Sequence, residues 1–138
     1  MLIIKTDRNL INDIDLPEEI ESIYLGYYDN NRDDLKEIDN KDVKELINYL
    51  DKEKVEIAGY GYINHDSAND IELFIKEDYR GSLCGEELFE RILKDCDKER
   101  LRFSIALENY PMIRILEKHN AINLGTNNGI VKYVMKKD

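Results

Sequence analysis

The segment from Asp70 to Leu88 most constrains how this chain can fold. Ile71, Leu73 and Ile75 alternate with the residues between them in the period of a half-buried β-strand. The apolar pattern stops at residues 76–78, and a loop with two glycines and then a helical pattern follow. A strand, a glycine loop and a helix start make an anion site, because the N–H groups of a helix's first turn point outward at the positive end of its dipole. The segment therefore predicts a phosphate-binding loop.

The chain as a whole is acidic. Among 138 residues, 30 are Asp or Glu and 20 are Lys or Arg, which gives a formal net charge of −10. Nucleic-acid backbones and anionic membranes bind to basic surfaces, so we expect neither partner. A cationic substrate such as an amine, a polyamine or a basic peptide would be attracted, although acidity can also serve solubility alone. The length suits a single domain spanning residues 1–138.

The sequence favours a cytoplasmic protein. No run approaches the ~20 apolar residues of a membrane span, and the short apolar start before Lys5 does not have the form of a signal peptide. Cys84 and Cys96 fit this compartment as thiols rather than as a disulfide. A helix between them would place them roughly 18 Å apart at ~1.5 Å per residue, beyond the limit of about 7 Å for a bridge. His65 and His119 are distant in sequence, so we expect no metal site.

Strand and helix patterns alternate along the rest of the chain, which predicts an α/β or α+β fold. Strands are expected at 2–5, 55–63, 70–75, 101–106, 122–125 and 130–135. The strands at 55–63 and 70–75 are expected to form one hairpin, and those at 122–125 and 130–135 another. Helices are expected at 41–50, at 86–96 and after Asn109. Asn109 can cap the last helix, and Pro111 suits its first turn. Segment 20–28 fits either a strand or a helix, and the polar segment 29–40 predicts a surface loop.

The strand, the RGSLCG loop and the following helix resemble motif A of the GNAT superfamily, the CoA-dependent N-acyltransferases. The later sequence ENYPMIRILEKHNAI resembles the family's second signature, a helix that opens with Asn. The two motifs occur in the family's order with a strand between them, and the resemblance covers Val55 to Met135 better than the residues before. It implies a GNAT-like mixed central sheet flanked by helices.

The resemblance also implies a binding site for acetyl-CoA and no metal. Motif A of the family binds the pyrophosphate through backbone amides, and the matching residues here are Arg80, Gly81, Ser82, Leu83, Cys84, Gly85 and Glu86. Leu73, Phe74 and Ile75 match the strand that pairs with the pantetheine arm through its backbone. Asn109 matches the asparagine that contacts the pantetheine or acetyl region. Arg80 can instead be a surface charge, and Asn109 a helix cap alone.

The sequence departs from the family pattern in its loop and in its second helix. Leu83 replaces the middle glycine, and a backbone cradle accommodates it as long as its φ is negative. Leu116 replaces the tyrosine that protonates the leaving thiolate, which leaves Cys84, Tyr110, solvent or no acid at all. After that helix, Asn120 and Ala121 stand where the family has glycine and phenylalanine.

The two acids at the start of the predicted helix also bear on anion binding. Glu86 and Glu87 complement the helix dipole without any ligand, and they would repel a pyrophosphate. Five tyrosines could line an acceptor pocket or occupy half-buried sheet positions: Tyr24, Tyr27, Tyr28, Tyr60 and Tyr62.

Acyl transfer to an amine needs N–H donors for the thioester carbonyl, a base for the amine and correct positioning. Glu72 is the candidate base because it faces opposite to Leu73 on the same strand, although it can also be a solvated carboxylate. We expect an acetyl-CoA-dependent N-acetyltransferase that acts by direct transfer on a primary amine of a small molecule or peptide. The alternatives are a non-catalytic GNAT-fold module that binds CoA or a protein partner, and a domain that binds another phosphate ligand. The resemblance also allows a homodimer.

Overall fold

A computed structural model describes residues 1–11, 13–28, 43–81 and 83–137. The strands are β1 (Leu2–Asp7), β2 (Ser22–Tyr27), β3 (Ile57–Ile63), β4 (Ile71–Ile75), β5 (Arg100–Ala106), β6 (Ile122–Asn127) and β7 (Ile130–Lys136), and the helices are α1 (Val43–Lys52), α2 (Cys84–Asp95) and α3 (Tyr110–Lys118), with 3-10 turns η1 (Arg8–Leu10) and η3 (Glu77–Tyr79). The expected α+β class is confirmed, and the ambiguous segment 20–28 contains a strand. The loop predicted at 29–40 lies outside the described residues.

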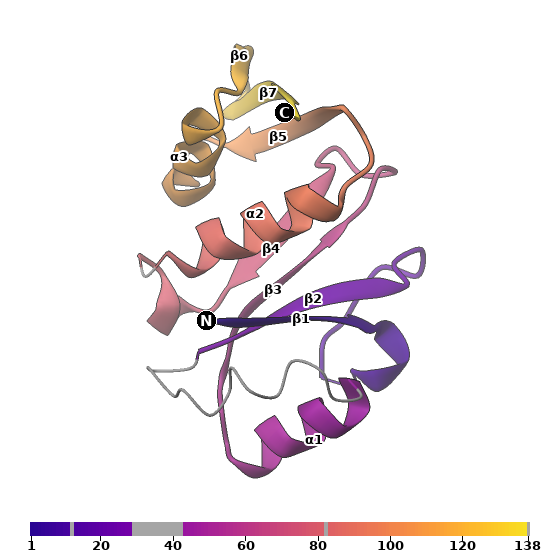
Figure 1. The fold of residues 1–138 in the computed structure, drawn as a ribbon. Coiled ribbons are helices and arrows are strands. Elements are labelled where there is room, and N and C mark those ends of the chain that lie inside the picture. Colours follow the sequence, from indigo (N-terminus) through magenta and orange to yellow (C-terminus); the bar gives the residue numbers. More distant parts are fainter. Residues whose placement is uncertain (12, 29–42, 82, 138) are drawn as a thin grey trace.

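The strands form two antiparallel sheets that meet at one point. The first has the order β1-β2-β3-β4 and the second the order β5-β7-β6. The junction is formed by the Asp70 N–H, which donates to the Arg102 carbonyl at 3.0 Å, and by the Ser104 N–H, which donates to Asn69 Oδ1 at 2.8 Å. From this junction β4 and β5 diverge (Figure 1). The edge of β4 that faces β5 is therefore not covered by a neighbouring strand of either sheet along the described chain.

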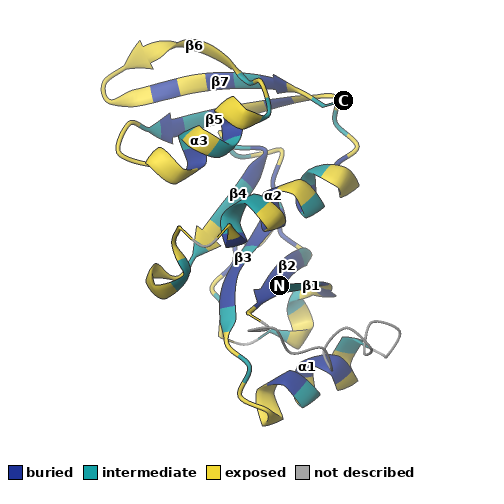
Figure 2. Cartoon of the chain, turned by 60° about the vertical axis from the view of Figure 1, so that its left-hand side comes forward, coloured by how far each residue is buried: buried dark blue, intermediate teal, exposed yellow. Residues whose placement is uncertain are grey.

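The hydrophobic core lies in two clusters on the two faces of the first sheet. Helix α2 covers one face and α1 the other (Figure 1), and Figure 2 shows β2 and β3 buried between them. Leu88, Phe89 and Ile92 of α2 are fully buried, as the apolar stripe of this helix predicts. Each such side chain contributes about 1.5–3 kcal/mol through burial, so α2 is firmly attached to the sheet. Within the described ranges, no helix is long and apolar enough to cross a membrane.

Strand β4 has the predicted alternation. Ile71, Leu73 and Ile75 pack into the cluster under α2. On the other face, the ring of Phe74 stacks on that of Tyr60 with centroids 4.9 Å apart. The alternation gives β4 an apolar side toward α2 and a mixed aromatic and acidic side away from it.

Two glycines of β3 allow an unusually close approach to β4. A Cβ atom on Gly59 would lie 2.6 Å from the carbonyl oxygen of Phe74, and one on Gly61 would lie 2.7 Å from that of Glu72. These distances are too short for any other residue without a shift of the backbone. Gly59 and Gly61 therefore determine where β4 lies.

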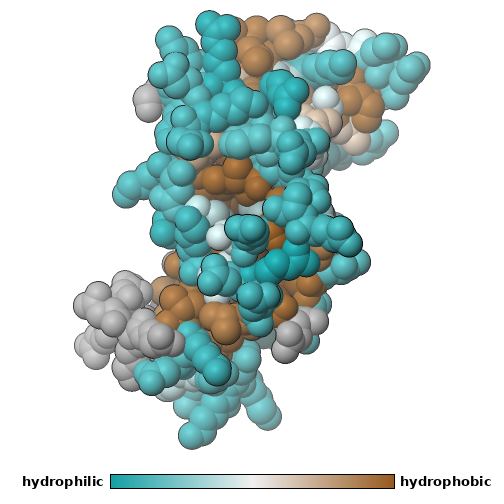
Figure 3. All heavy atoms as spheres, turned by 90° about the vertical axis from the view of Figure 1, so that its right-hand side faces the viewer, coloured by the Kyte–Doolittle hydropathy of each residue, from teal (hydrophilic) through white to brown (hydrophobic). Residues whose placement is uncertain are grey.

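The closing hairpin is formed by β6 and β7, as the sequence predicts. Asn128 and Gly129 at its turn have φ values of 54° and 78°, the left-handed pair that a tight hairpin requires. Strand β6 is exposed along its whole length (Figure 2). Ile122, Leu124 and Ile130 are exposed apolar residues of this hairpin, and apolar surface is visible at this end of the molecule, at the top of Figure 3.

Candidate functional site

A cleft of about 550 Å³ lies where β4 and β5 diverge. Its walls come from β4, from the turn after it, from the start of α2, from the end of β5 and from the start of α3. The predicted site residues that line it are Glu72, Leu73, Phe74, Ile75, Arg80, Gly85 and Asn109. Gly81, Leu83, Cys84 and Glu86 are not among the lining residues, and Ser82 lies outside the described residues. The structure thus brings the strand, the helix start and the second motif to one cavity.

The backbone of β4 presents alternate residues to this cleft. The Asn64 N–H donates to the Asp70 carbonyl at 2.9 Å, and the Lys76 N–H donates to the Ala58 carbonyl at 2.8 Å. In an antiparallel pair, residues that bond to the partner alternate with residues whose N–H and C=O groups point away from it. By this alternation, Phe74 directs its backbone to β3, whereas the backbone groups of Leu73 and Ile75 point toward the cleft. Phe74 contributes its side chain.

The loop before α2 does not meet the condition set for Leu83 from the sequence. Its φ is not negative: Leu83 has φ 69° and ψ 0° and lies in the left-handed region that favours glycine. Gly81 is also left-handed, with φ 82°. The Leu83 side chain is 66% exposed, so it projects into solvent. The leucine adopts a left-handed backbone at the position where the family has glycine, and this conformation lowers the stability of the folded state.

Helix α2 begins beside the end of β4. Its hydrogen-bond ladder starts with the Glu87 N–H donating to the Leu83 carbonyl at 3.0 Å. The amides of Gly85 and Glu86 therefore precede the ladder, at the positive end of the helix dipole. A Cβ on Gly85 would lie 3.4 Å from Cγ1 of Ile75 and 3.6 Å from Cδ1 of Ile115, so glycine keeps this end of the cleft open. Cys84 is buried and does not line the cleft, and neither cysteine forms a disulfide.

The two acids of the first turn differ in their surroundings. Glu86 forms an ion pair with Lys118 of α3, which offsets its charge close to the helix N-terminus. The Glu86 side chain is only 18% exposed, whereas Glu87 lies on the exposed side of α2. Arg80 lines the cleft on the near side of the same helix start. The local charge at the cleft is consequently less negative than the sequence suggests.

Glu72 lies on the cleft side of β4, on the face opposite to Leu73, as expected. It is half-buried rather than fully solvated, and Ser67 Oγ donates to its Oε1 at 3.2 Å. Burial raises the pKa of the Glu72 carboxyl above its ordinary value, and hydrogen bonds from Ser67 and Asn69 offset part of that rise. A carboxylate with a raised pKa is a better proton acceptor than an ordinary glutamate. The aromatic rings of Tyr60 and Phe74 also line this part of the cleft.

The second motif positions α3 against the cleft but supplies no acid at the expected place. The Asn109 side chain accepts a hydrogen bond from the Met112 N–H at 3.3 Å, so its role as helix cap is confirmed. Leu116 is fully buried in the core beneath the helix. Tyr110 is 68% exposed and is not among the lining residues. The one tyrosine among the described residues that line the cleft is Tyr60.

Sequence reasoning missed the apolar wall of the cleft. Ile105 at the end of β5 and Met112 and Ile115 on α3 face β4 across it. The helical spacing of the two α3 residues indicates a packed face, but nothing in that spacing distinguishes a core from a cavity wall.

No protein-family model and no curated protein matches this sequence. Among solved structures, a putative acetyltransferase from Salmonella typhimurium, determined with its cofactor acetyl-CoA, is similar with a TM-score of 0.49 and 14% identity over 71% of this chain and 75% of that chain. A putative acetyltransferase from Acinetobacter baylyi is similar with a TM-score of 0.50 and 12% identity over 83% of this chain and 91% of that chain. The similarity to the Acinetobacter baylyi structure shows the fold alone. This chain has the GNAT-type α+β fold that its motifs imply.

Proposed function

We propose that this protein binds acetyl-CoA in the cleft between β4 and β5 and transfers the acetyl group to a primary amine of a small molecule or peptide. The observation that carries the proposal is the convergence of three elements on one cavity. These are the cleft-facing backbone of Leu73 and Ile75, the N-terminus of α2 at Gly85, and the guanidinium of Arg80.

These residues suit the chemical groups of a CoA thioester. The first-turn amides and Arg80 would bind the pyrophosphate, because backbone N–H groups at a helix start and a guanidinium both recognise phosphate oxygens. The N–H and C=O groups of Leu73 and Ile75 would pair with the amides of the pantetheine arm as an added strand does. The apolar wall formed by Ile105, Met112 and Ile115 would face that arm. When bound, acetyl-CoA supplies an activated acetyl group, which forms an amide with the amine and leaves CoA as a thiol.

Glu72 would act as the base. An amine attacks only in its neutral form, so an ammonium substrate must lose a proton before it reacts. Glu72 lines the cleft and has a carboxyl pKa raised by burial, and it would accept that proton directly or through a water molecule. The net charge of −10 favours a cationic acceptor. We place this activity in the cytoplasm, where the thiols of Cys84 and Cys96 would remain reduced.

A second candidate function is a non-catalytic module that binds CoA or a protein partner. Leu116 favours it, because this side chain is buried in the core where the resemblance expects a tyrosine acid. A thiolate is a tolerable leaving group, so loss of that acid does not exclude transfer. The two candidates differ in whether thiol is released when an amine is added.

Two measurements on the full chain test the proposal. Calorimetric titration with acetyl-CoA tests binding, and thiol release in the presence of a panel of amines tests transfer. Arg80→Gln should weaken acetyl-CoA binding roughly tenfold, as expected for loss of a charged hydrogen bond. Arg100→Gln is the matched control, since Arg100 is an exposed residue at the start of β5, outside the cleft lining.

Each outcome separates the candidates. Binding with amine-dependent thiol release supports the transferase. Binding with no release for any amine supports the module. Absence of acetyl-CoA binding contradicts both the transferase and the CoA-binding form of the module.

A further inference from the structure

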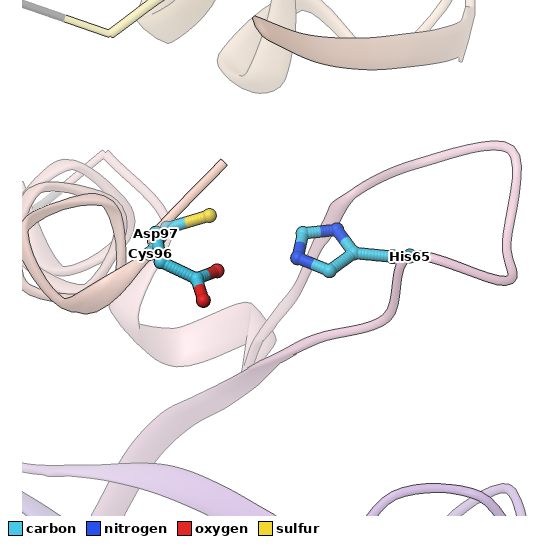
Figure 4. A group of neighbouring side chains, drawn as sticks. All are labelled: His65, Cys96 and Asp97. Atoms are coloured by element: carbon cyan, nitrogen blue, oxygen red, sulfur yellow. The ribbon is translucent and has the colours of Figure 1, made fainter. Parts of the chain in front are cut away.

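Three side chains with metal-binding atoms converge at the joint between the two sheets, away from the cleft. They are His65 in the β3–β4 turn, Cys96 at the end of α2, and Asp97 after it. One ligand atom from each residue lies within 4.8 Å of the others. Figure 4 shows the imidazole of His65 facing the thiol and the carboxylate across a shared space.

The imidazole of His65 is held in place from behind. Its Nδ1 lies 2.9 Å from Oδ1 of Asp70, a carboxylate with no exposed surface. That carboxylate is itself fixed, because Oδ2 accepts the Arg102 N–H at 2.6 Å and Lys98 Nζ lies 3.1 Å from Oδ1. An ionised carboxylate accepts hydrogen bonds and donates none, so Nδ1 carries the proton and Nε2 presents its lone pair. A buried carboxylate behind the imidazole is the arrangement that orients histidine ligands in zinc sites.

The donor set matches the preferences of zinc. Zn²⁺ binds imidazole nitrogen, thiolate sulfur and carboxylate oxygen. At its usual bond lengths, a tetrahedral ion separates such atoms by roughly 3.3–3.7 Å. The ligand atoms lie within 4.8 Å of one another, so they must come closer to reach that range, and the exposed Asp97 side chain is able to rotate toward the ion.

The local charges are also balanced for a divalent cation. The Cys96 thiolate and the Asp97 carboxylate would balance the two charges of the ion, while Lys98 and Arg102 offset the charge of Asp70 behind the imidazole. Cys96 is only 1% exposed. A thiol so deeply buried is poorly placed to attack a substrate, whereas an ion can reach it from the exposed side occupied by His65 and Asp97.

We propose that His65, Cys96 and Asp97 bind one Zn²⁺ ion, with water in the fourth position. The thiol loses its proton to solvent as the Zn–S bond forms. The ion ties the β3–β4 turn to the chain between α2 and β5, beside the Asp70–Arg102 hydrogen bond that joins the two sheets. The site is therefore a structural clamp at the joint between the two sheets, and it does not depend on the proposed transferase function. The sequence expectation of no metal site considered histidines alone and missed that residues 65 and 96 meet in space.

The test uses the full chain, stripped of metal with a chelator under reducing conditions. Titration with Co²⁺ should give a thiolate-to-cobalt charge-transfer absorption that saturates at one equivalent, and Zn²⁺ should displace it. Zn²⁺ should also raise the thermal unfolding temperature, because an ion that binds only the folded state stabilises it by mass action.

The chain contains only two cysteines and two histidines, which provides matched controls. Cys96→Ser should abolish the charge-transfer absorption while Cys84→Ser retains it. His65→Ala should weaken Zn²⁺ binding by more than about 100-fold, beyond the usual effect of an outer-shell residue, while His119→Ala leaves it unchanged.

Several results would overturn the proposal. These are the absence of Co²⁺ charge transfer in the wild-type protein, equal effects of the two cysteine variants, or Zn²⁺ binding that survives His65→Ala. Circular dichroism of each metal-free variant checks its folding. If Cys96→Ser does not fold, the wild-type cobalt spectrum together with the His65 and His119 pair decides the question.

Discussion

The carboxylate of Glu86 in the first turn of α2 is paired with the ammonium of Lys118 at the end of α3. This pair joins the two helices that flank the cleft. It also neutralises an acid that would otherwise repel an anion at the α2 N-terminus. The proposed phosphate site therefore depends on a cation that belongs to a different motif.

Removal of that cation should weaken acetyl-CoA binding. Lys118→Gln leaves Glu86 uncompensated, and we expect the dissociation constant to rise roughly two- to fivefold, the usual range for a partly exposed ion pair. Calorimetry measures the change. The double variant Glu86→Gln/Lys118→Gln should restore wild-type affinity, and Lys132→Gln on β7 is the control. An unchanged affinity in Lys118→Gln would show that Glu86 does not face the bound phosphates.

Leu83→Gly should stabilise the protein. A left-handed leucine costs about 1–2 kcal/mol, whereas glycine adopts φ 69° without strain but loses more chain entropy on folding. We expect a net gain of about 0.5–1 kcal/mol in the free energy of unfolding, measured by urea denaturation. Gly81→Ala should instead lower the free energy of unfolding, because Gly81 has φ 82°. Destabilisation by Leu83→Gly would mean that its exposed side chain makes contacts that outweigh the strain.

Gly61→Ala should displace β4. The new Cβ would lie 2.7 Å from the Glu72 carbonyl oxygen, which is backbone and cannot rotate away. We expect a loss of about 1–3 kcal/mol, the range for overpacking, together with weaker acetyl-CoA binding. Gly26→Ala is the milder comparison, since the three atoms nearest its Cβ belong to the side chains of Met1 and Leu88, at 3.1–3.3 Å, and not to backbone. Equal effects of the two variants would contradict the importance of the β3–β4 approach.

Asp70→Asn should destabilise the joint between the sheets by ~2 kcal/mol at neutral pH, because charged hydrogen bonds are lost. Burial alone would raise the pKa of Asp70, but the Arg102 amide, His65 and Lys98 outweigh it and lower the pKa below the ordinary 3.8. A lowered pKa stabilises the fold above the ordinary value, and this stability is lost as the pH falls through the folded-state pKa. Urea denaturation of wild type and variant should therefore converge in acid. A constant difference at every pH would assign the effect to packing.

Glu72→Gln should reduce kcat about 100-fold or more if Glu72 is the base. Because burial raises the Glu72 pKa above 4.5, wild-type activity should fall in acid at a pH above the usual glutamate range. The activity of the variant should not show this acid-side fall.

The pH dependence of stability that Glu72 causes has the opposite sign to that caused by Asp70. A raised pKa lowers stability as the pH rises, so Glu72→Gln should be relatively more stable at pH 7 than at pH 4. Glu87→Gln, outside the cleft lining, is the control.

Local patterns predicted the elements well where one periodicity dominated. The apolar stripe of α2, the alternation in β4 and the cap at Asn109 are each determined by neighbouring residues, and the structure confirms them. The φ of Leu83 could not be predicted from the sequence, because intrinsic preference favours a negative φ and the turn into α2 overrides it.

Local sequence patterns do not predict contacts between distant segments. Glu86 and Lys118 are 32 residues apart, and no local signal indicates that they pair. The convergence of His65 with Cys96 likewise depends on the packing of the β3–β4 turn against the end of α2. The candidate base Glu72 could be placed on a face of β4 from the sequence, but its burial required the surrounding fold.

The most direct test of the account is amide hydrogen exchange, residue by residue, with and without saturating acetyl-CoA. The backbone alternation in β4 predicts that the amides of Leu73 and Ile75 exchange more slowly when acetyl-CoA is bound. The amide of Phe74, which faces β3, should exchange slowly in both states. Unchanged exchange at Leu73 and Ile75 in the presence of bound acetyl-CoA, or equal protection along all of β4, would contradict the proposed binding mode.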